Sequence, residues 1–242
     1  MSAPNLDELG TWLAAFARSI AFLQSAPYVG DRNLPSRYRI AAAALLALAV
    51  LPVRAHVSLA NLPLTIPAEL FIGLTAGFVG RLVIAGAEAG GQLIGLELEL
   101  GFAGIFDPIA AEETLPTRRL AHTLAGLAFL GADGLGSAVR LLASASVDGR
   151  SPARAFASVL LHGGQVLQTA VRIAAPTVVA AMIAHLTVAV ANRAAPALNV
   201  FSVALALVLC AGCMALIATA PVLVREIIAV GRAAADSVGG LR

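Results

Sequence analysis

The stretch Glu88-Ala-Gly-Gly-Gln-Leu-Ile-Gly-Leu-Glu-Leu-Glu-Leu-Gly-Phe-Ala-Gly-Ile-Phe-Asp107-Pro108 places five glycines and four carboxylates in a strongly apolar sequence. A helix facing lipid disfavours charge, and a helix facing water is weakened by glycine. Glycine is favourable where two helix backbones approach closely, and a buried carboxylate is tolerated where a polar partner meets it. The stretch therefore predicts closely packed helices around a polar feature.

The composition is that of a membrane protein or of a subunit buried in a larger assembly. Of 242 residues, 59% are hydrophobic and 12% are charged, whereas soluble domains are about 25% charged. The net charge is only +2, and the basic residues are spread along the chain, so no basic face for nucleic acid is predicted. The length predicts one helical domain, and the acidic residues Asp7 and Glu8 near the N-terminus disfavour a cleavable signal peptide.

Apolar runs separated by breaks rich in proline and glycine predict an all-α protein of bent helices and helical hairpins. The alternation typical of strands is absent. The runs cover about 9–30, 40–53, 62–106, 119–147, 155–192 and 197–224. A membrane-spanning helix needs about 20 apolar residues. The second run is therefore short, and the third and fifth are expected to bend or to fold into hairpins.

Charged residues inside these runs disfavour helices that are surrounded by lipid alone. Each costs roughly 2.5–3.5 kcal/mol at the centre of a bilayer on insertion scales. The charged residues are Arg18, Glu69, Arg81, Glu88, Glu97, Glu99, Asp133, Arg140 and Arg172. We expect the helices to pack against protein, and we expect the four glutamates to be buried charges that meet a cation, a hydrogen-bond donor or water.

One helical face between residues 69 and 95 is rich in glycine. At steps of three or four residues, this face reads Glu69, Gly73, Gly77, Gly80, Ile84, Glu88, Gly91 and Gly95. Glycines at this spacing let two helices pack closely. The partner is either another helix of the chain or a neighbouring subunit. Within the chain, Arg81 and Arg18 are the candidate cations for the carboxylates at the two ends of this face. A third interpretation is an ion or proton path through the two carboxylates, because ionisable residues in membranes also mark relays.

The segment after this face predicts an apolar constriction. Phe102, Ile105 and Phe106 lie among helix-breaking glycines and directly before Asp107-Pro108. The segment either plugs the bundle of its own chain or narrows a conduit, since hydrophobic constrictions close pores.

No catalytic group, metal site or cofactor is predicted. His56, His122, His162 and His185 lack the spacing of metal ligands, and neither a nucleophile elbow nor a phosphate-binding loop occurs. Cys210 and Cys213 lie in the charge-free run 194–224, which contains no histidine, and are expected to be small buried side chains. We expect a protein that is not an enzyme.

Three groups of residues resemble the FliR/SctT family of flagellar and virulence type III secretion. The first is Ala89-Gly90, Ile94-Gly95-Leu96, Phe102-Ala103 and Asp107-Pro108. The second is the run Asn192-Arg193-x-Ala195-Pro196-x-Leu198-Asn199-Val200-Phe201. The third is Arg18, Ala26-Pro27, Leu34-Pro35 and Arg37. Together the matches extend from about residue 18 to residue 221, and the second pattern favours the flagellar branch.

The resemblance implies a core subunit of the type III protein-export gate, which helps to form and close the channel for unfolded flagellar proteins. It implies FliP-like, FliQ-like and FlhB-like partner subunits and a multi-pass location in the bacterial inner membrane, within the flagellar basal body. It also implies a FliP-like part over about 1–150, a FliQ-like helical hairpin over about 151–242, and a plug near 102–118.

The chain departs from the family at Glu97, Leu98 and Glu99, where the family usually has Gln, Met and Gly. Because two added carboxylates lie beside the expected constriction, the sequence does not decide which side chains line it.

The alternative function is a small-solute or ion transporter that uses buried Glu69 and Glu88. The absence of an inverted repeat of the glycine-rich face in the second half of the sequence disfavours it.

Overall fold

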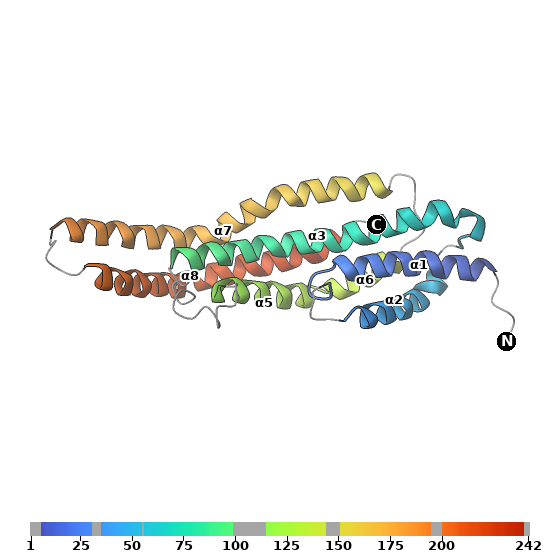
Figure 1. The fold of residues 1–242 in the computed structure, drawn as a ribbon, viewed down its shortest axis with the longest axis horizontal. Coiled ribbons are helices and arrows are strands. Elements are labelled where there is room, and N and C mark those ends of the chain that lie inside the picture. Colours follow the sequence, from blue (N-terminus) through green and yellow to red (C-terminus); the bar gives the residue numbers. More distant parts are fainter. Residues whose placement is uncertain are drawn as a thin grey trace. The chain divides into compact units, whose positions relative to one another are not determined.

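The computed structural model describes residues 6–30, 35–54, 56–98, 115–143, 151–194 and 200–239, and helices dominate these segments (Figure 1). The α-helices are α1 (Leu6–Ser25), α2 (Ser36–Val50), α3 (Leu62–Glu97), α5 (Pro116–Gly131), α6 (Gly134–Ala143), α7 (Ser151–Ala194) and α8 (Val200–Gly239). Short 3-10 helices, η1 and η2, cover Leu51–Val53 and Leu59–Asn61. The predicted all-α class is confirmed.

Proline sets several of the helix boundaries. Pro35 caps the start of α2 with an extended backbone (φ −56°, ψ 139°), and Pro116 is the first residue of α5. An amide is not needed at these positions, so the missing N–H of proline costs little there. Pro67, Pro176 and Pro221 lie inside α3, α7 and α8, where each removes one backbone hydrogen bond. These helices are long enough to continue past the lost bond.

Within the described residues, each of the two longest apolar runs forms one helix. α3 has 36 residues and α7 has 44. The sequence predicted that each of these runs either bends or folds into a hairpin. Neither helix folds back on itself within its described residues, so neither run forms a hairpin there. Helix propagation adds one hydrogen bond for each residue fixed, and no polar turn sequence interrupts either run.

The chain divides into two compact units. Unit 1 comprises Met1–Ile84, Phe129–Gly164 and Gly231–Arg242, and unit 2 comprises Ala85–Ala128 and Gln165–Val230. In unit 1, α1 packs against α2, α6 and both 3-10 helices. Its core combines the larger side chains of Phe22, Leu141 and Leu142 with many alanines. Small side chains at these contacts bring the helices close together.

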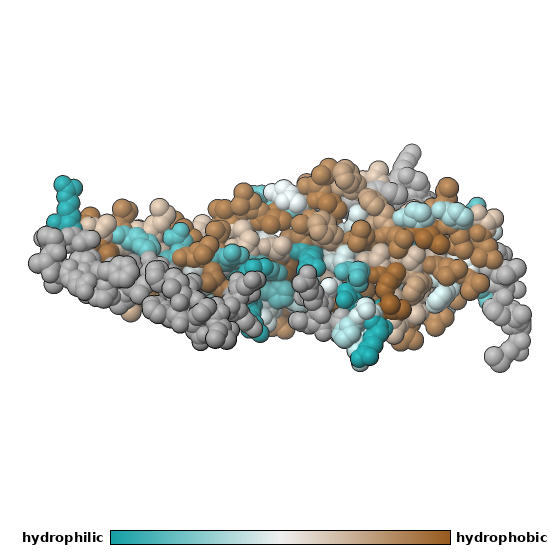
Figure 2. All heavy atoms as spheres, viewed as in Figure 1, coloured by the Kyte–Doolittle hydropathy of each residue, from teal (hydrophilic) through white to brown (hydrophobic). Residues whose placement is uncertain are grey.

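Among the described residues, four segments are long and apolar enough to cross a membrane, and the bent pair α5 and α6 makes a fifth if the two helices form one span. They are Ser36–Val53, Leu59–Glu97, Phe156–Val190 and Leu209–Asp236. The chain itself buries 56% of the most apolar window of α3 but only 17–22% of the windows in the other three. Figure 2 shows hydrophobic residues over much of the visible surface. Of these four segments, α3 is therefore the most buried, while α2, α7 and α8 present apolar faces outward.

Candidate functional site

In unit 1, the carboxylate of Glu69 on α3 is completely buried between two arginines. Arg18 Nε of α1 donates to Glu69 Oε2 at 2.5 Å, and Arg54 Nη2, just after η1, donates to Glu69 Oε1 at 2.6 Å. Arg18 Nη1 also donates to the backbone carbonyl of Leu141 in α6 at 3.0 Å. One buried ionic cluster therefore joins α1, α3, α6 and the end of η1.

This cluster contains two cations and one anion. Arg18 is 2% exposed and Arg54 is 6% exposed, so neither charge is solvated by water. Burial lowers the pKa of Arg54, and repulsion by Arg18 adds to this effect, while attraction to Glu69 and the hydrogen bond that Arg54 donates to it oppose the shift. Arg54 Nη1 is buried and finds no hydrogen-bond partner in the part of the chain that the structure describes. The burial of both arginines therefore depends on Glu69.

In unit 2, the second carboxylate of α3 links that helix to α5. Arg118 Nη2 donates to Glu88 Oε2 at 3.2 Å, and His122 Nδ1 lies 2.7 Å from Glu88 Oε1. Arg118 and His122 are four residues apart, so they lie on one face of α5. All three side chains are partly exposed. Water screens this cluster, and we expect it to contribute less to stability than the buried cluster around Glu69.

The glycines of α3 lie where other helices approach its backbone. A Cβ added to Gly73 or Gly77 would collide with α1, at the carbonyl of Arg18 and at Ser25 Oγ respectively. A Cβ at Gly91 would lie 2.6 Å from the backbone oxygen of Thr117, and one at Gly95 would collide with the hydroxyl of the same residue in α5. Helices of this chain therefore cover the glycine-rich face at these four positions.

The remaining predicted site residues fall in three groups. Gly80 is buried within α3, Glu97 is half-buried at the end of α3, and Arg193 is exposed near the end of α7. Asn192 lies in the last turn of α7, and Phe201 lies in the first turn of α8. Glu99, the predicted plug residues Phe102, Ile105 and Phe106, and the signature residues Asp107, Pro108, Pro196 and Asn199 lie outside the described residues.

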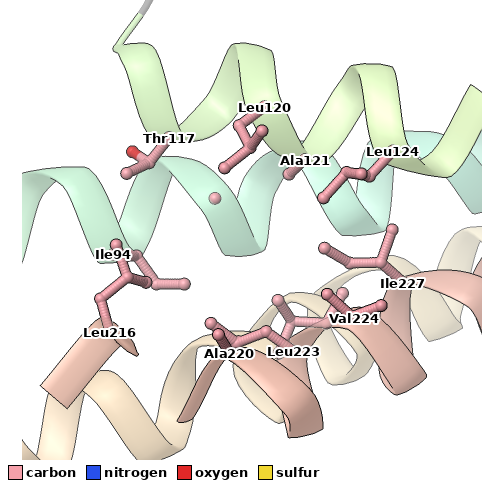
Figure 3. A pocket seen from close by; sticks show the side chains of 12 residues that line it. Ile94, Thr117, Leu120, Ala121, Leu124, Leu216, Ala220, Leu223, Val224 and Ile227 are labelled. Atoms are coloured by element: carbon pink, nitrogen blue, oxygen red, sulfur yellow. The ribbon is translucent and has the colours of Figure 1, made fainter. Parts of the chain in front are cut away.

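An apolar pocket lies within unit 2, between α3, α5, α7 and α8. Its volume is about 110 Å³, and its walls include Ile94, Leu120, Leu124, Leu223 and Ile227 (Figure 3). Thr117 also lines the pocket, and its hydroxyl is buried without a hydrogen-bond partner in the described segments. The surface of the pocket carries no polar groups that could act in catalysis, so the pocket suits only an apolar ligand or side chain.

Sequence reasoning identified Arg18 as a possible partner for Glu69 but missed three others. Arg54, Arg118 and His122 lie 15, 30 and 34 residues from the carboxylates that they contact. The spacing of Arg118 and His122 was a usable signal, since it puts both on one face of α5. Cys210 and Cys213 were expected to be buried, but both thiols are free and exposed on α8, because that helix is mostly uncovered within the chain.

A threonine pair joins α7 and α8 within unit 2. Thr177 Oγ1 lies 3.1 Å from Thr219 Oγ1, and Thr177 is completely buried. Hydrogen bonds between membrane helices contribute about 0.6 kcal/mol on average.

We expect Thr177→Val, which keeps the shape of the side chain, to lower the free energy of unfolding by about 0.5–1 kcal/mol. Thr187→Val is the matched control, because Thr187 is exposed and bonds only the carbonyl of Ile183 in its own helix. Unfolding in detergent, followed by circular dichroism, measures both, and equal effects would contradict a role for the pair.

Comparison with known proteins identifies the family. The model of the family "Bacterial export proteins, family 1" matches residues 9–231. A flagellar biosynthetic protein FliR of Aquifex aeolicus is 31% identical over 88% of this chain and 86% of its own length. Proteins of the same name from Pectobacterium carotovorum and Escherichia coli are 29% and 25% identical, over 88% and 90% of this chain and 86% and 87% of their own lengths. With its several span-length apolar helices, the chain belongs to this family of bacterial export proteins as a multi-pass inner-membrane component of the flagellar export gate.

Proposed function

We propose that the chain is a core structural subunit that helps to form and close the channel for unfolded flagellar proteins. The match to export proteins over residues 9–231 supports this most strongly. A second support is that α2, α7 and α8 are apolar and of spanning length but are largely uncovered by the chain itself. Such helices need lipid or other subunits against them. FliP-like, FliQ-like and FlhB-like subunits are the proposed neighbours.

The proposed organisation has a FliP-like part over about 1–150 and a FliQ-like hairpin over about 151–242. The threonine contact between α7 and α8 supports the hairpin. The charge cluster around Glu69 supports close packing of the unit 1 helices of the first part, because it holds α1 and α6 against α3. Residues 98–115, which include the proposed plug and Glu99, connect α3 to α5.

The proposed role is not catalytic. In the described segments, the ionic clusters around Glu69 and Glu88 hold helices together, and no group of His, Cys, Asp and Glu side chains is arranged to hold a metal ion. A transporter that relays protons through Glu69 is less well supported. Such a carboxylate must exchange protons with water, whereas this one is completely buried and bonded to two arginines.

Co-expression distinguishes the gate from the transporter. We expect the chain to purify in a stable complex with FliP-like and FliQ-like subunits of the same organism. Purification as a stable monomer that drives solute uptake into liposomes, with no affinity for those subunits, would favour the transporter instead.

The proposed plug makes a direct prediction about leakage. Replacing both Phe102 and Phe106 with glycine removes the largest apolar side chains of the segment, so we expect the resting complex to pass ions or small solutes. The measurement is ion flux through liposomes that contain the purified complex. Phe156→Gly, an exposed position on α7, is the control for loss of a phenylalanine. A complex that assembles with the double substitution and is as tight as the unsubstituted one would refute the plug.

A further inference from the structure

Arg172 is an exposed arginine in the middle of an apolar helix. It lies in the unit 2 part of α7, within the span-length segment Phe156–Val190. Sixteen residues of that segment precede it and eighteen follow it. Its side chain is exposed and has no hydrogen bond or ion pair with any residue that the structure describes. A guanidinium in such a setting is costly unless an acceptor meets it.

Two glutamines extend this position into a polar stripe. Gln165 and Gln168 are exposed and lie seven and four residues before Arg172, so the three side chains share one face of α7. We call Gln165, Gln168 and Arg172 the polar stripe. The neighbouring face packs on α3, where Thr169 and Ile173 lie against Gly86 and Gly90. The polar stripe is therefore turned away from the contact between α7 and α3.

Apolar side chains lie exposed along α7 on both sides of the polar stripe. Leu160 and Leu161 precede it, and Val179, Met182 and Leu186 follow it, each more than half exposed. The segment Phe156–Val190 has 35 residues, which makes it about 52 Å long, whereas the hydrocarbon core of a bilayer is about 30 Å thick. Lipid therefore covers at most about 20 of these residues. Another protein must cover the rest of this apolar surface.

The chemistry of the polar stripe selects the kind of protein that covers it. α7 contains no Asp or Glu, so Arg172 cannot be neutralised from its own helix. The guanidinium fork binds a carboxylate with two parallel hydrogen bonds. Glutamine side chains hydrogen-bond across packed helices in membranes. A lipid phosphate would satisfy the arginine alone, but it would leave the two glutamines and the leucines before them uncovered.

We propose that the polar stripe is a docking surface for a helix of another gate subunit, which places a carboxylate against Arg172. The inference rests on the proposed function, because the partner is a member of the same gate. The partner helix is apolar except for one Asp or Glu, with a polar side chain one to two turns away that meets Gln168 or Gln165.

The lysine-free sequence allows a direct test of the contact. All 16 basic residues of the chain are arginine, so R172K introduces its only side-chain amine. In the purified complex, an apolar carbodiimide activates carboxylates, and an adjacent amine displaces the activated oxygen to give an amide and a urea. We expect mass spectrometry to find an amide between position 172 and one Asp or Glu of a different gate subunit. The same treatment of the unsubstituted complex gives no link at this position.

A second measurement tests whether the charge holds the complex together. We expect R172L to lower the amount of co-purified partner subunit at least tenfold. The melting temperature of the isolated chain should not change, because Arg172 makes no hydrogen bond or ion pair with another described residue. R232L is the matched control, since Arg232 is also exposed on α8 and lies one turn before Asp236. We expect R232L to leave co-purification unchanged. Once the linked carboxylate is known, exchanging the two charges should restore assembly.

Several results would overturn the inference. If R172L assembles like the unsubstituted chain and R172K forms no amide with another subunit, lipid or water satisfies the arginine. An amide to Glu97 or Glu226 of the same chain would show an internal ion pair, and an amide to a second copy would show self-association. If the unsubstituted chain binds no gate subunit at all, the proposed function fails, which is a different outcome from failure of R172K and R172L in a complex that forms.

Discussion

Replacing Glu69 with glutamine is expected to lower the free energy of unfolding of the chain by about 3–5 kcal/mol. The substitution keeps the size of the side chain but leaves Arg18 and Arg54 buried side by side without an anion. One carboxylate oxygen also becomes an amide nitrogen, which cannot accept a hydrogen bond. In detergent, we expect a melting temperature about 10 °C lower, together with loss of protein export.

Two controls separate loss of the anion from loss of any ion pair. Asp133→Asn breaks the pair between Asp133 and Arg140, whose side chains are 66% and 50% exposed. It should cost less than about 1 kcal/mol, and asparagine tolerates the positive φ of 58° at that position. Replacing Arg18, Arg54 and Glu69 together with apolar residues of similar size should recover most of the stability. Equal effects of Glu69→Gln and Asp133→Asn would contradict the importance of the buried cluster.

Adding one methyl group at Gly73 or Gly77 is expected to destabilise the contact between α1 and α3 by about 1–3 kcal/mol. In each alanine variant, the new Cβ occupies space held by α1 or by the residue directly after it, including backbone at the Arg18 carbonyl and the Ala26 amide. Backbone cannot rotate away as a flexible side chain can, so the two helices must separate. Separation also lengthens the hydrogen bond from Arg18 to Glu69.

In the matched control variants, we expect alanine to change the stability in the opposite direction. Gly163 and Gly164 lie in α7, and an added Cβ would meet nothing within 4 Å at either position. Alanine there should stabilise the helix, by up to about 1 kcal/mol at each site. Thermal unfolding of the four single variants gives the comparison. If Gly73→Ala and Gly163→Ala shift the melting temperature in the same direction, helix propensity rather than close packing governs the glycines of α3.

The sequence was sufficient for the fold class because its strongest signals are local. Long apolar runs without strand alternation specify helices, and the spacing of Gly73, Gly77, Gly91 and Gly95 marks one face of α3. Helix length was less predictable. Pro67 and Pro176 are usual signals for a break, but α3 and α7 continue past them, because tertiary packing outweighs one lost hydrogen bond.

The ionic partners were the least predictable part of the candidate site. Glu69 was recognisable as a costly residue in an apolar run, yet only the fold brings Arg54 and the Leu141 carbonyl to the same cluster. For Arg172, likewise, the sequence does not reveal whether an ionic partner lies within the chain. Its cost was evident from the sequence, but only the structure shows that it is exposed and makes no hydrogen bond or ion pair with any described residue.

Export of flagellar proteins by cells that lack this chain tests the central claim most directly. The measurement is the amount of flagellar filament or hook protein in the culture medium and inside the cells, with and without the chain supplied in trans. We predict that export stops without the chain, that the substrate accumulates inside the cells, and that the unsubstituted chain restores export while the Glu69→Gln variant does not. Normal export by cells without the chain would contradict its role as a core subunit of the gate.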